Sequence, residues 1–387
     1  MKYLSGKKKR DFFSGIDWLL FFSTIPLLFA GLITMRSLGA ENLSGGGNYF
    51  FSRQIIWVAV SIVIFFIFSA IDWRFLRKSG MLILLFFLVF FVLVTLLISG
   101  KVIKGATSWL NLYFFSVEPS DLAKLVLVLI LSKYFARRHV EIANVVHILI
   151  SAVYAAVFAG LVFFQPDFGS ALVLFLIWFG MIMVSGISKK HLLLVFLIMA
   201  IIFSLSWFLV LKPYQKDRII TFLQPLKDIR GSGYNSLQSM IAVGSGQIFG
   251  RGVGYGSQSR LGFLPEHQTD FVFAAFAEEW GLIGVIFVFL FYGVVIWRII
   301  SNAFLGESNF EVLFGVGLAI LIASHFFINV GMNVGVMPIT GIPLPFMSYG
   351  GSNLLTVFSG LGILMGMRRY NRRAHAEDVA TEFLGPK

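Results

Sequence analysis

The sequence predicts an all-α, polytopic integral membrane protein, and two properties of the chain carry that prediction. Of the 387 residues, 58% are hydrophobic and only 13% are charged, which is too few to cover the surface of a water-soluble domain. The apolar residues also fall into long, nearly uncharged runs, the pattern that a lipid environment requires. The chain has no Cys, so disulfides and thiolate metal sites are excluded.

The apolar runs predict ten transmembrane helices, because each run approaches the ~20 apolar residues that cross ~30 Å of hydrocarbon. The predicted spans cover residues 17–37, 54–71, 80–98, 120–136, 144–164, 168–186, 191–211, 271–296, 312–333 and 351–367. A large loop, residues 212–270, separates the seventh helix from the eighth. The whole chain, residues 1–387, is predicted to form one transmembrane domain with short tails at residues 1–16 and 368–387.

Basic residues predict the orientation of these helices. Five clusters fall on one side when ten helices are counted: KKKR, DWRFLRKSG, SKYFARRHVE, GISKKH and MRRYNRRAH. Because short loops rich in Lys and Arg stay inside, this side is predicted to be cytoplasmic, with both termini there. The net charge of +12 therefore fits topology and anionic lipid as a partner better than nucleic acid.

The predicted outer loop, residues 212–270, is basic and rich in glycine. Its cations are Lys212, Lys216, Arg218, Lys227, Arg230, Arg251 and Arg260. They could bind lipid headgroups, or several could converge on a phosphorylated lipid substrate. The loop lacks a dinucleotide fingerprint and the chain lacks a G-x-x-x-x-G-K-[ST] motif, so no nucleotide cofactor is predicted. The stretch NSLQSMIAV could form a short amphipathic helix on the membrane surface.

Two predicted helix starts carry charged residues with both a structural and a functional interpretation. Asp121 and Lys124 lie three residues apart, so they share a helix face and can form an ion pair or belong to a site. Asp167 follows Pro166 between two apolar runs, where it can cap a helix or act in a site. Charge near lipid is costly, so each residue is expected to have a partner or a purpose.

A third acid, Asp270, stands directly before an apolar run in LPEHQTDFVFAAF, residues 264–276. It can cap the eighth predicted helix, and the topology places it at the outer membrane–water boundary. Glu278 and Glu279 lie ~12 Å deeper in the same helix. At ~100° per residue they cannot both share the face of Asp270, so packing or pairing with another helix is their predicted role.

The stretch NVGVMPITGIPLPFMSYGGSN, residues 333–353, is predicted to form a re-entrant segment before the tenth helix. Its three prolines forbid a regular helix, and it is too apolar for a free loop. Ser348 and Gly350 lie where SYGGSN opens the last helix, and bare amides there could hold a phosphate. Gly350 and Gly351 could equally allow close packing against another backbone.

This same stretch resembles the signature of the SEDS family (shape, elongation, division and sporulation proteins). Three other stretches resemble further blocks of that family in the expected order: GATSWLNLYFFSVEPSDLAKL, FFQPDFGSAL and LPEHQTDFVFAAFAEEWGLIG. The resemblance covers nearly the whole chain, and GIPLPFMSYGG is similar to the RodA branch rather than the FtsW branch. One departure is Ser108 before Trp109, where the family commonly has a basic residue.

The resemblance implies a peptidoglycan glycosyltransferase that polymerises lipid II for cell elongation and shape, outside the cytoplasmic membrane of a bacterium. It implies that Asp270 is catalytic and that Asp121, Lys124 and Asp167 are important. The candidate substrate-binding residues are Asp121, Lys124, Asp167, Trp109, Arg218, Arg251, Arg260, Ser348 and Gly350.

The chemistry of such a reaction needs one base and a source of positive charge. A sugar hydroxyl that attacks an anomeric carbon must lose its proton, so Asp270 is expected to act as general base. The pyrophosphate leaves as a stable anion and needs no acid, unlike the leaving group in glycoside hydrolysis. Lys124, the loop arginines or a divalent cation, Mg²⁺ or Mn²⁺, are expected to stabilise it.

Three other functions stay open at this point: an FtsW-type division polymerase of the same family, a lipid II flippase, or a scaffold for another enzyme. A flippase needs a polar path, which Asp121, Lys124, Glu278 and Glu279 could line. A scaffold has no need for an acid at the outer face. Because a polymerase of this type lacks a transpeptidase, the resemblance implies a class B penicillin-binding protein and elongation-complex proteins as partners.

Overall fold

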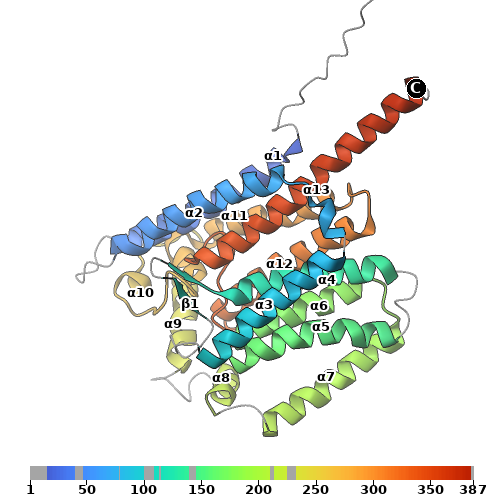
Figure 1. The fold of residues 1–387 in the computed structure, drawn as a ribbon. Coiled ribbons are helices and arrows are strands. Elements are labelled where there is room, and N and C mark those ends of the chain that lie inside the picture. Colours follow the sequence, from blue (N-terminus) through green and yellow to red (C-terminus); the bar gives the residue numbers. More distant parts are fainter. Residues whose placement is uncertain are drawn as a thin grey trace, which may run out of the picture.

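The computed structural model describes residues 15–39, 47–77, 79–99, 109–112, 115–138, 145–209, 213–224 and 232–384. Within these ranges the chain is almost entirely helical. Figure 1 shows the long helices running side by side, with α8, α9, α10 and the short strands gathered at one end. The C-terminal part of α13 projects from the other end.

Each of the ten predicted spans coincides with a long helix in the described part of the chain. These helices are α1 (Trp18–Gly39), α2 (Gly47–Ala70), α3 (Ser79–Ser99), α4 (Pro119–Arg138), α5 (Val145–Phe164), α6 (Phe168–Val184), α7 (Lys189–Leu209), α11 (Val272–Ala303), α12 (Asn309–Asn333) and α13 (Gly351–Leu384). The prediction of an all-α, polytopic membrane protein is confirmed.

Seven of these helices are long and apolar enough to cross a membrane, namely α1, α2, α3, α5, α7, α11 and α12. Helix α6 is apolar but has only 17 residues. The count of ten crossings therefore stays a prediction. The N-terminal KKKR cluster used to predict the orientation lies outside the described residues.

The large predicted loop contains three shorter helices: α8 (Pro213–Leu223), α9 (Ser232–Ser245) and α10 (Ser257–Arg260). Helix α9 contains the NSLQSMIAV stretch that was expected to form a helix. One feature was not predicted, an antiparallel hairpin of β1 (Leu110–Leu112) and β2 (Phe115–Val117). This hairpin leads directly into Pro119, the first residue of α4.

Helix α12 lies at the centre of the bundle. In its most apolar window 72% of the residues are buried, against 6% in the corresponding window of α7. Gly317 of α12 lets α4 and α6 approach closely, because a Cβ there would lie 2.7 Å from Val128 Cγ1 and 3.1 Å from Met181 Sδ. Helix α12 is thus surrounded by protein, whereas α7 is open to lipid.

Helix α11 is broken at Gly281, whose φ of 64° and ψ of −164° are not helical. The residues between α9 and α10 pack into this break and replace the lost helical hydrogen bonds. The amides of Arg251 and Gly252 donate to the carbonyls of Glu278 and Glu279, and the amides of Leu282 and Ile283 donate to the carbonyls of Gln247 and Ile248, at 2.9–3.2 Å. The loop is therefore fixed to α11 through its backbone.

The two acids beside this break also hold the loop. The Glu278 carboxylate accepts hydrogen bonds from the amides of Gln258 and Ser259 in α10, at 2.8 and 3.1 Å. The Glu279 carboxylate accepts from Ser37 Oγ of α1 at 2.6 Å and from the Gly254 amide at 2.9 Å. Pairing with other helices was the predicted role of these acids, and the structure shows it.

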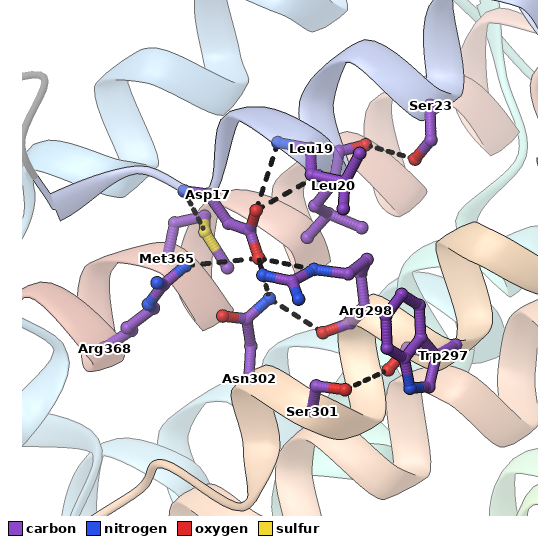
Figure 2. Close-up of polar contacts among 10 residues, drawn as sticks. All are labelled: Asp17, Leu19, Leu20, Ser23, Trp297, Arg298, Ser301, Asn302, Met365 and Arg368. Carbon is purple, nitrogen blue, oxygen red and sulfur yellow. Dashed lines mark hydrogen bonds and ion pairs between the residues drawn. The ribbon is translucent and has the colours of Figure 1, made fainter.

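A polar cluster holds α1, α11 and α13 together at the other end of α11 (Figure 2). The Asp17 carboxylate accepts hydrogen bonds from Asn302 Nδ2 at 2.7 Å and from the guanidinium of Arg298. Arg368 of α13 forms a further ion pair with Asp17 at 3.3 Å. Asp17 also accepts the amide of Leu19 at 3.1 Å, so one buried carboxylate both starts α1 and ties it to two neighbours.

The break in α11 generates a prediction about stability. In Gly281→Ala the added Cβ would lie 2.3 Å from the Gly250 amide nitrogen, at a φ that L residues rarely adopt. We expect the variant to be less stable by at least ~1–3 kcal/mol, measured as a lower thermal unfolding midpoint in detergent micelles. Gly293→Ala, in the same helix with nothing within 4 Å of its Cβ, is the matched control and should be neutral or stabilising. Equal midpoints for the two variants would contradict this role of Gly281.

Candidate active site

The re-entrant segment was predicted over residues 333–353, and in the structure it covers residues 334–350, because Asn333 ends α12 and Gly351 begins α13. It lies among the helices without forming one. Ile342, Leu344 and Phe346 are each 1% exposed, so the segment is part of the protein interior. Its backbone finds partners within the fold: the Leu344 amide donates to Ser348 Oγ at 2.8 Å, and Tyr292 Oη donates to the carbonyl of Pro345. Irregular backbone at this depth is stable because such partners replace water.

Asp270 lies two residues before α11, and its backbone is held by α12. Its carbonyl accepts hydrogen bonds from Asn329 Nδ2 at 2.9 Å and Asn333 Nδ2 at 3.2 Å. Asn329 Nδ2 also donates to the carbonyl of Ile342 at 2.8 Å, which ties Asp270 to the re-entrant segment. The N-cap residue of α11 is Phe271 rather than Asp270, so the prediction that Asp270 caps this helix is wrong.

Gly341 of the re-entrant segment lies against the side chain of Asp270. A Cβ on Gly341 would be 3.5 Å from Asp270 Oδ2, and the φ of Gly341 is +74°. The residues on either side of Gly341 contact α6, because a Cβ on Gly169 would lie 2.6 Å from the carbonyl of Thr340 and 2.8 Å from Ile342 Cδ1. The re-entrant segment thus connects the Asp270 carboxylate to the start of α6.

Asp167 caps the start of α6, as the sequence predicted. Its Oδ1 accepts the Ser170 amide at 2.9 Å, and Asp167 is the N-cap residue of the helix. The cap and a role in the site are compatible, because Asp167 is two residues from Gly169 and hence beside the re-entrant segment.

Asp121 and Lys124 form the ion pair that their spacing predicted. Lys124 Nζ lies 2.9 Å from Asp121 Oδ1, and the two side chains are only 2% and 4% exposed. Burying two charges costs several kcal/mol for each ion unless they pair, so this pair is a fixed feature of α4.

Glu118 is a site residue that sequence reasoning missed. Its carboxylate accepts the hydroxyls of Ser120 at 2.5 Å and Ser170 at 3.3 Å, and its amide donates to Ser352 Oγ at 2.8 Å. It therefore joins the starts of α4, α6 and α13. Its position directly before the PSD sequence at the start of α4 is the signal in the sequence that points to it.

His325 and the two asparagines of α12 were also missed, although their spacing was a signal. His325, Asn329 and Asn333 recur every four residues in a mainly apolar helix, so they share one face. His325 Nδ1 lies 3.2 Å from the carbonyl of Pro343 and 3.5 Å from Asn353 Nδ2. This face of α12 binds the re-entrant segment along its length.

Backbone groups of Ser348 and Gly350 form hydrogen bonds within the protein. The Ser348 carbonyl accepts Gln54 Nε2 at 3.0 Å, and the Gly350 amide donates to Gln54 Oε1 at 3.4 Å. Gly351 packs against Trp57, because a Cβ there would lie 2.2 Å from its ring. These contacts favour the packing interpretation of the two glycines, with α2 as the neighbour.

The loop cations are only partly described. Arg251 and Arg260 are exposed, and Arg251 Nε donates to the carbonyl of Ser245 at 3.0 Å. Trp109 is half-buried beside β1. Arg218 lies in α8, but the placement of its side chain is outside the described part of the structure.

The carboxylates of the site lie apart from one another in the described part of the chain, each with its own partner. No group of three or more His, Cys, Asp or Glu side chains in the described ranges could hold a metal ion. Asp121 is paired with Lys124, Asp167 caps α6, and Glu118 binds two hydroxyls. Each of these three acids therefore already has a partner within the protein.

Comparison with known sequences places these features in a family. A family profile for FtsW, RodA and SpoVE, described as "Cell cycle protein", matches residues 17–373. The chain is 35% identical over 370 residues to "Probable peptidoglycan glycosyltransferase FtsW" of Wigglesworthia glossinidia brevipalpis, covering 94% of this chain and 96% of the relative. It is 32% identical over 356 residues to "Peptidoglycan glycosyltransferase MrdB" of Escherichia coli K12, covering 90% and 94%.

Solved structures show the same fold. A chain from a structure described as "Structural coordination of polymerization and crosslinking by a peptidoglycan synthase complex" has a TM-score of 0.77 and 29% identity, covering 92% of this chain and 98% of that chain. Rod shape determining protein RodA of Thermus thermophilus has a TM-score of 0.67 and 27% identity, with coverage of 92% and 98%.

The buried ion pair of the site generates a second prediction. Lys124→Met leaves the Asp121 carboxylate buried without its partner, and we expect a loss of ~3–5 kcal/mol in stability. The double variant Asp121→Val with Lys124→Met removes both charges and should recover most of that loss. Thermal unfolding midpoints in detergent measure both effects. A double variant as unstable as Lys124→Met alone would contradict the interpretation of the two residues as a pair.

Proposed function

Because this chain belongs to the SEDS family, the family of FtsW, RodA and SpoVE, we propose that it is a peptidoglycan glycosyltransferase that polymerises lipid II. One observation carries the proposal beyond family membership. The re-entrant segment contacts the Asp270 carboxylate through Gly341, and contacts the start of α6 through Thr340 and Ile342. The Asp270 carboxylate and the start of α6 therefore contact the same segment. The start of α6 is in turn joined through the Ser170–Glu118 hydrogen bond to the start of α4, the helix that contains Lys124.

Asp270 is the proposed general base. The acceptor sugar hydroxyl attacks the anomeric carbon of the donor and gives up its proton to the Asp270 carboxylate in the transition state. The backbone of Asp270 is fixed by Asn329 and Asn333, which supports a defined position for the carboxylate. A single displacement inverts the α-linked donor to a β-linked product.

Positive charge stabilises the departing pyrophosphate in this proposal. The bond from the anomeric carbon to the pyrophosphate oxygen breaks, and the electron pair leaves with the phosphate. Lys124 is positioned by Asp121 at the outer end of α4, and Arg251 and Arg260 extend from the loop that is fixed to α11. The polyprenyl tails remain in lipid beside the bundle.

The site is proposed to face outward, with both termini in the cytoplasm. The starts of α4, α6 and α11 lie together near the re-entrant segment, while Arg298 and Arg368 lie together with Asp17 at the opposite end of α11. The latter end carries basic residues of the kind that stay inside. This supports a site at the outer face of a bacterial cytoplasmic membrane.

An elongation role, as in the RodA branch, is proposed over a division role. The GIPLPFMSYGG stretch of the re-entrant segment supports it through its resemblance to that branch. The relatives include FtsW and MrdB at similar identity, so a division role is the alternative. Depletion of the protein separates them, since loss of an elongation polymerase gives round cells and loss of a division polymerase gives filaments.

A transpeptidase is the proposed partner. The described part of the chain is built from long apolar helices and the loop that contains α8, α9 and α10, and the similar solved structure concerns the coordination of polymerization and crosslinking by a peptidoglycan synthase complex. A class B penicillin-binding protein, acting with other elongation proteins, would crosslink the glycan that this chain makes.

The proposed base is tested by Asp270→Asn with purified protein and labelled lipid II, in the absence of any other polymerase. We expect glycan formation to fall by ~10²- to 10⁴-fold, because the amide cannot accept the proton. Asp72→Asn is the matched control, since Asp72 pairs with the exposed Arg74 outside the site, and it should retain wild-type activity. Undiminished polymerisation by Asp270→Asn would disprove the base assignment, and lipid scrambling without any glycan would favour a flippase.

A divalent cation bound with the donor pyrophosphate stays a prediction, and chelation tests it. The ligands of such an ion would be mainly oxygens of the substrate, because the acids of the site are already paired. We expect EDTA to reduce polymerisation and Mg²⁺ or Mn²⁺ to restore it. Full activity in EDTA would leave Lys124 and the arginines as the sources of positive charge.

A further inference from the structure

Helix α11 acquires a lipid-facing side only beyond its break at Gly281. Residues 272–279, before the break, are all buried within the protein. Leu282 and Ile283, directly after it, are more than half exposed. The helix runs on to Arg298 of the polar cluster, ~26 Å from the break at ~1.5 Å per residue. Because the hydrocarbon layer is ~30 Å thick and this polar cluster marks its other edge, the break lies near the edge of the membrane core on the side of the site.

The residues between α9 and α10 bring apolar side chains to the level of this break. The Ile283 amide donates to the carbonyl of Ile248 at 3.2 Å, so Ile248 lies directly beside the lipid-facing side of α11. Phe249, the next residue, is 80% exposed, and Tyr255 is 72% exposed. Trp280, at the break itself, is exposed as well. Exposed aromatic side chains at this height are typical of the boundary between membrane and water.

The same residues can enter an apolar environment because their backbone is already paired. Four hydrogen bonds join them to the two sides of the break in α11, as described above. Gly250 lets the chains approach closely, since a Cβ there would lie 2.1 Å from the carbonyl of Glu279. Irregular backbone is tolerated at membrane depth where protein groups replace water in this way.

The charge of this part of the loop favours lipid as its neighbour. Residues 247–263 include two arginines, Arg251 and Arg260, and no Asp or Glu. A positively charged surface with exposed apolar side chains is complementary to the headgroups and acyl chains of an anionic membrane. The surface also continues the side of α11 that faces lipid, so lipid rather than a soluble protein is the neighbour that this position selects.

We propose that four residues form an apolar anchor that inserts into the nearer membrane leaflet, which is the outer one in the proposed orientation. They are Ile248, Phe249, Val253 and Tyr255, all of them exposed. The anchor holds Arg251 at the level of the lipid headgroups, because Arg251 is two residues from Phe249 and its amide is bound to α11. One consequence rests on the proposed function: at this level Arg251 meets the pyrophosphate of a donor whose polyprenyl chain lies in the same leaflet.

The depth of residue 249 can be measured directly, because the chain has no Cys and a single introduced one is labelled uniquely. Phe249→Cys carries a nitroxide in vesicles of phosphatidylethanolamine and phosphatidylglycerol, and its collisions with oxygen and with a water-soluble nickel complex report its depth. We expect it ~5–10 Å into the boundary between headgroups and acyl chains, the depth that interfacial anchors reach. Glu266→Cys, at an exposed loop position, is the water-facing control, and Leu290→Cys, on the exposed side of α11, is the lipid-facing control.

Two outcomes of this measurement would overturn the anchor. One is a nitroxide at position 249 that meets the nickel complex as often as the nitroxide at position 266. The other is a nitroxide that stays in water in these vesicles and is shielded only when a purified transpeptidase is added, because the surface would then bind protein instead of lipid.

The consequence for the donor is tested by lipid II polymerisation in the same vesicles. Phe249→Ser combined with Tyr255→Ser removes the two most exposed rings of the anchor, and the unfolding midpoint in detergent should stay at the wild-type value. We expect KM for lipid II to rise ~10-fold or more, the factor that burial of one aromatic side chain contributes to an equilibrium, while kcat is unchanged. Phe249→Trp is the matched control and should keep the wild-type KM, because Trp also favours the interface.

An unchanged KM in the double serine variant would overturn the role of the anchor in positioning Arg251. If the wild type makes no glycan at all, the proposed function fails instead, and the depth of the nitroxide at position 249 alone decides whether the anchor exists.

Discussion

The structure depends on one constraint, that backbone amides and carbonyls within an apolar environment must find partners in the protein. Continuous helices meet this requirement by themselves. The two irregular stretches in the core of the fold, the re-entrant segment and the break at Gly281, meet it with partners from elsewhere in the chain. Asn329 of α12 supports the first, and the amides and carbonyls of the loop support the second.

The site follows from how these irregular stretches are held. Because the re-entrant segment is extended rather than helical, it can contact both Asp270 and Gly169, which are far apart in sequence. Asn329 and Asn333 on one face of α12 hold the backbone of Asp270, so its position is set by the most buried of the candidate membrane-spanning helices. The break in α11 does the same for the loop, because it anchors the segment that contains Arg251. Both stretches bring the proposed base and the proposed cations to one end of the bundle.

Local sequence signals were enough to predict the helices, the re-entrant segment and two of the polar contacts. The three-residue spacing of Asp121 and Lys124 predicted their ion pair, and the position of Asp167 predicted its cap. Both contacts are local, so they depend on few other parts of the fold. The hairpin before α4 was missed because its strands are three residues each, too short for a periodic pattern.

Contacts between distant segments could not be predicted in the same way. Glu118 meets Ser170 and Ser352, which lie 52 and 234 residues away, and nothing in the local sequence points to either serine. The replacement of helical hydrogen bonds at Gly281 depends equally on a loop that precedes α11. Gln54, whose side chain forms hydrogen bonds with the Ser348 carbonyl and the Gly350 amide, lies in α2, almost 300 residues earlier in the chain. Long-range packing, rather than propensity, decided these parts of the site.

A structure of the protein with lipid II and an acceptor glycan, obtained with the slow variant Asp270→Asn, would test the central claim most directly. The account predicts the donor pyrophosphate within ~3–4 Å of Lys124 Nζ or of a loop arginine. It also predicts the acceptor hydroxyl ~3 Å from the side chain of residue 270, across the anomeric carbon from the pyrophosphate. A donor bound with its pyrophosphate away from these cations, or an acceptor hydroxyl out of reach of residue 270, would contradict it.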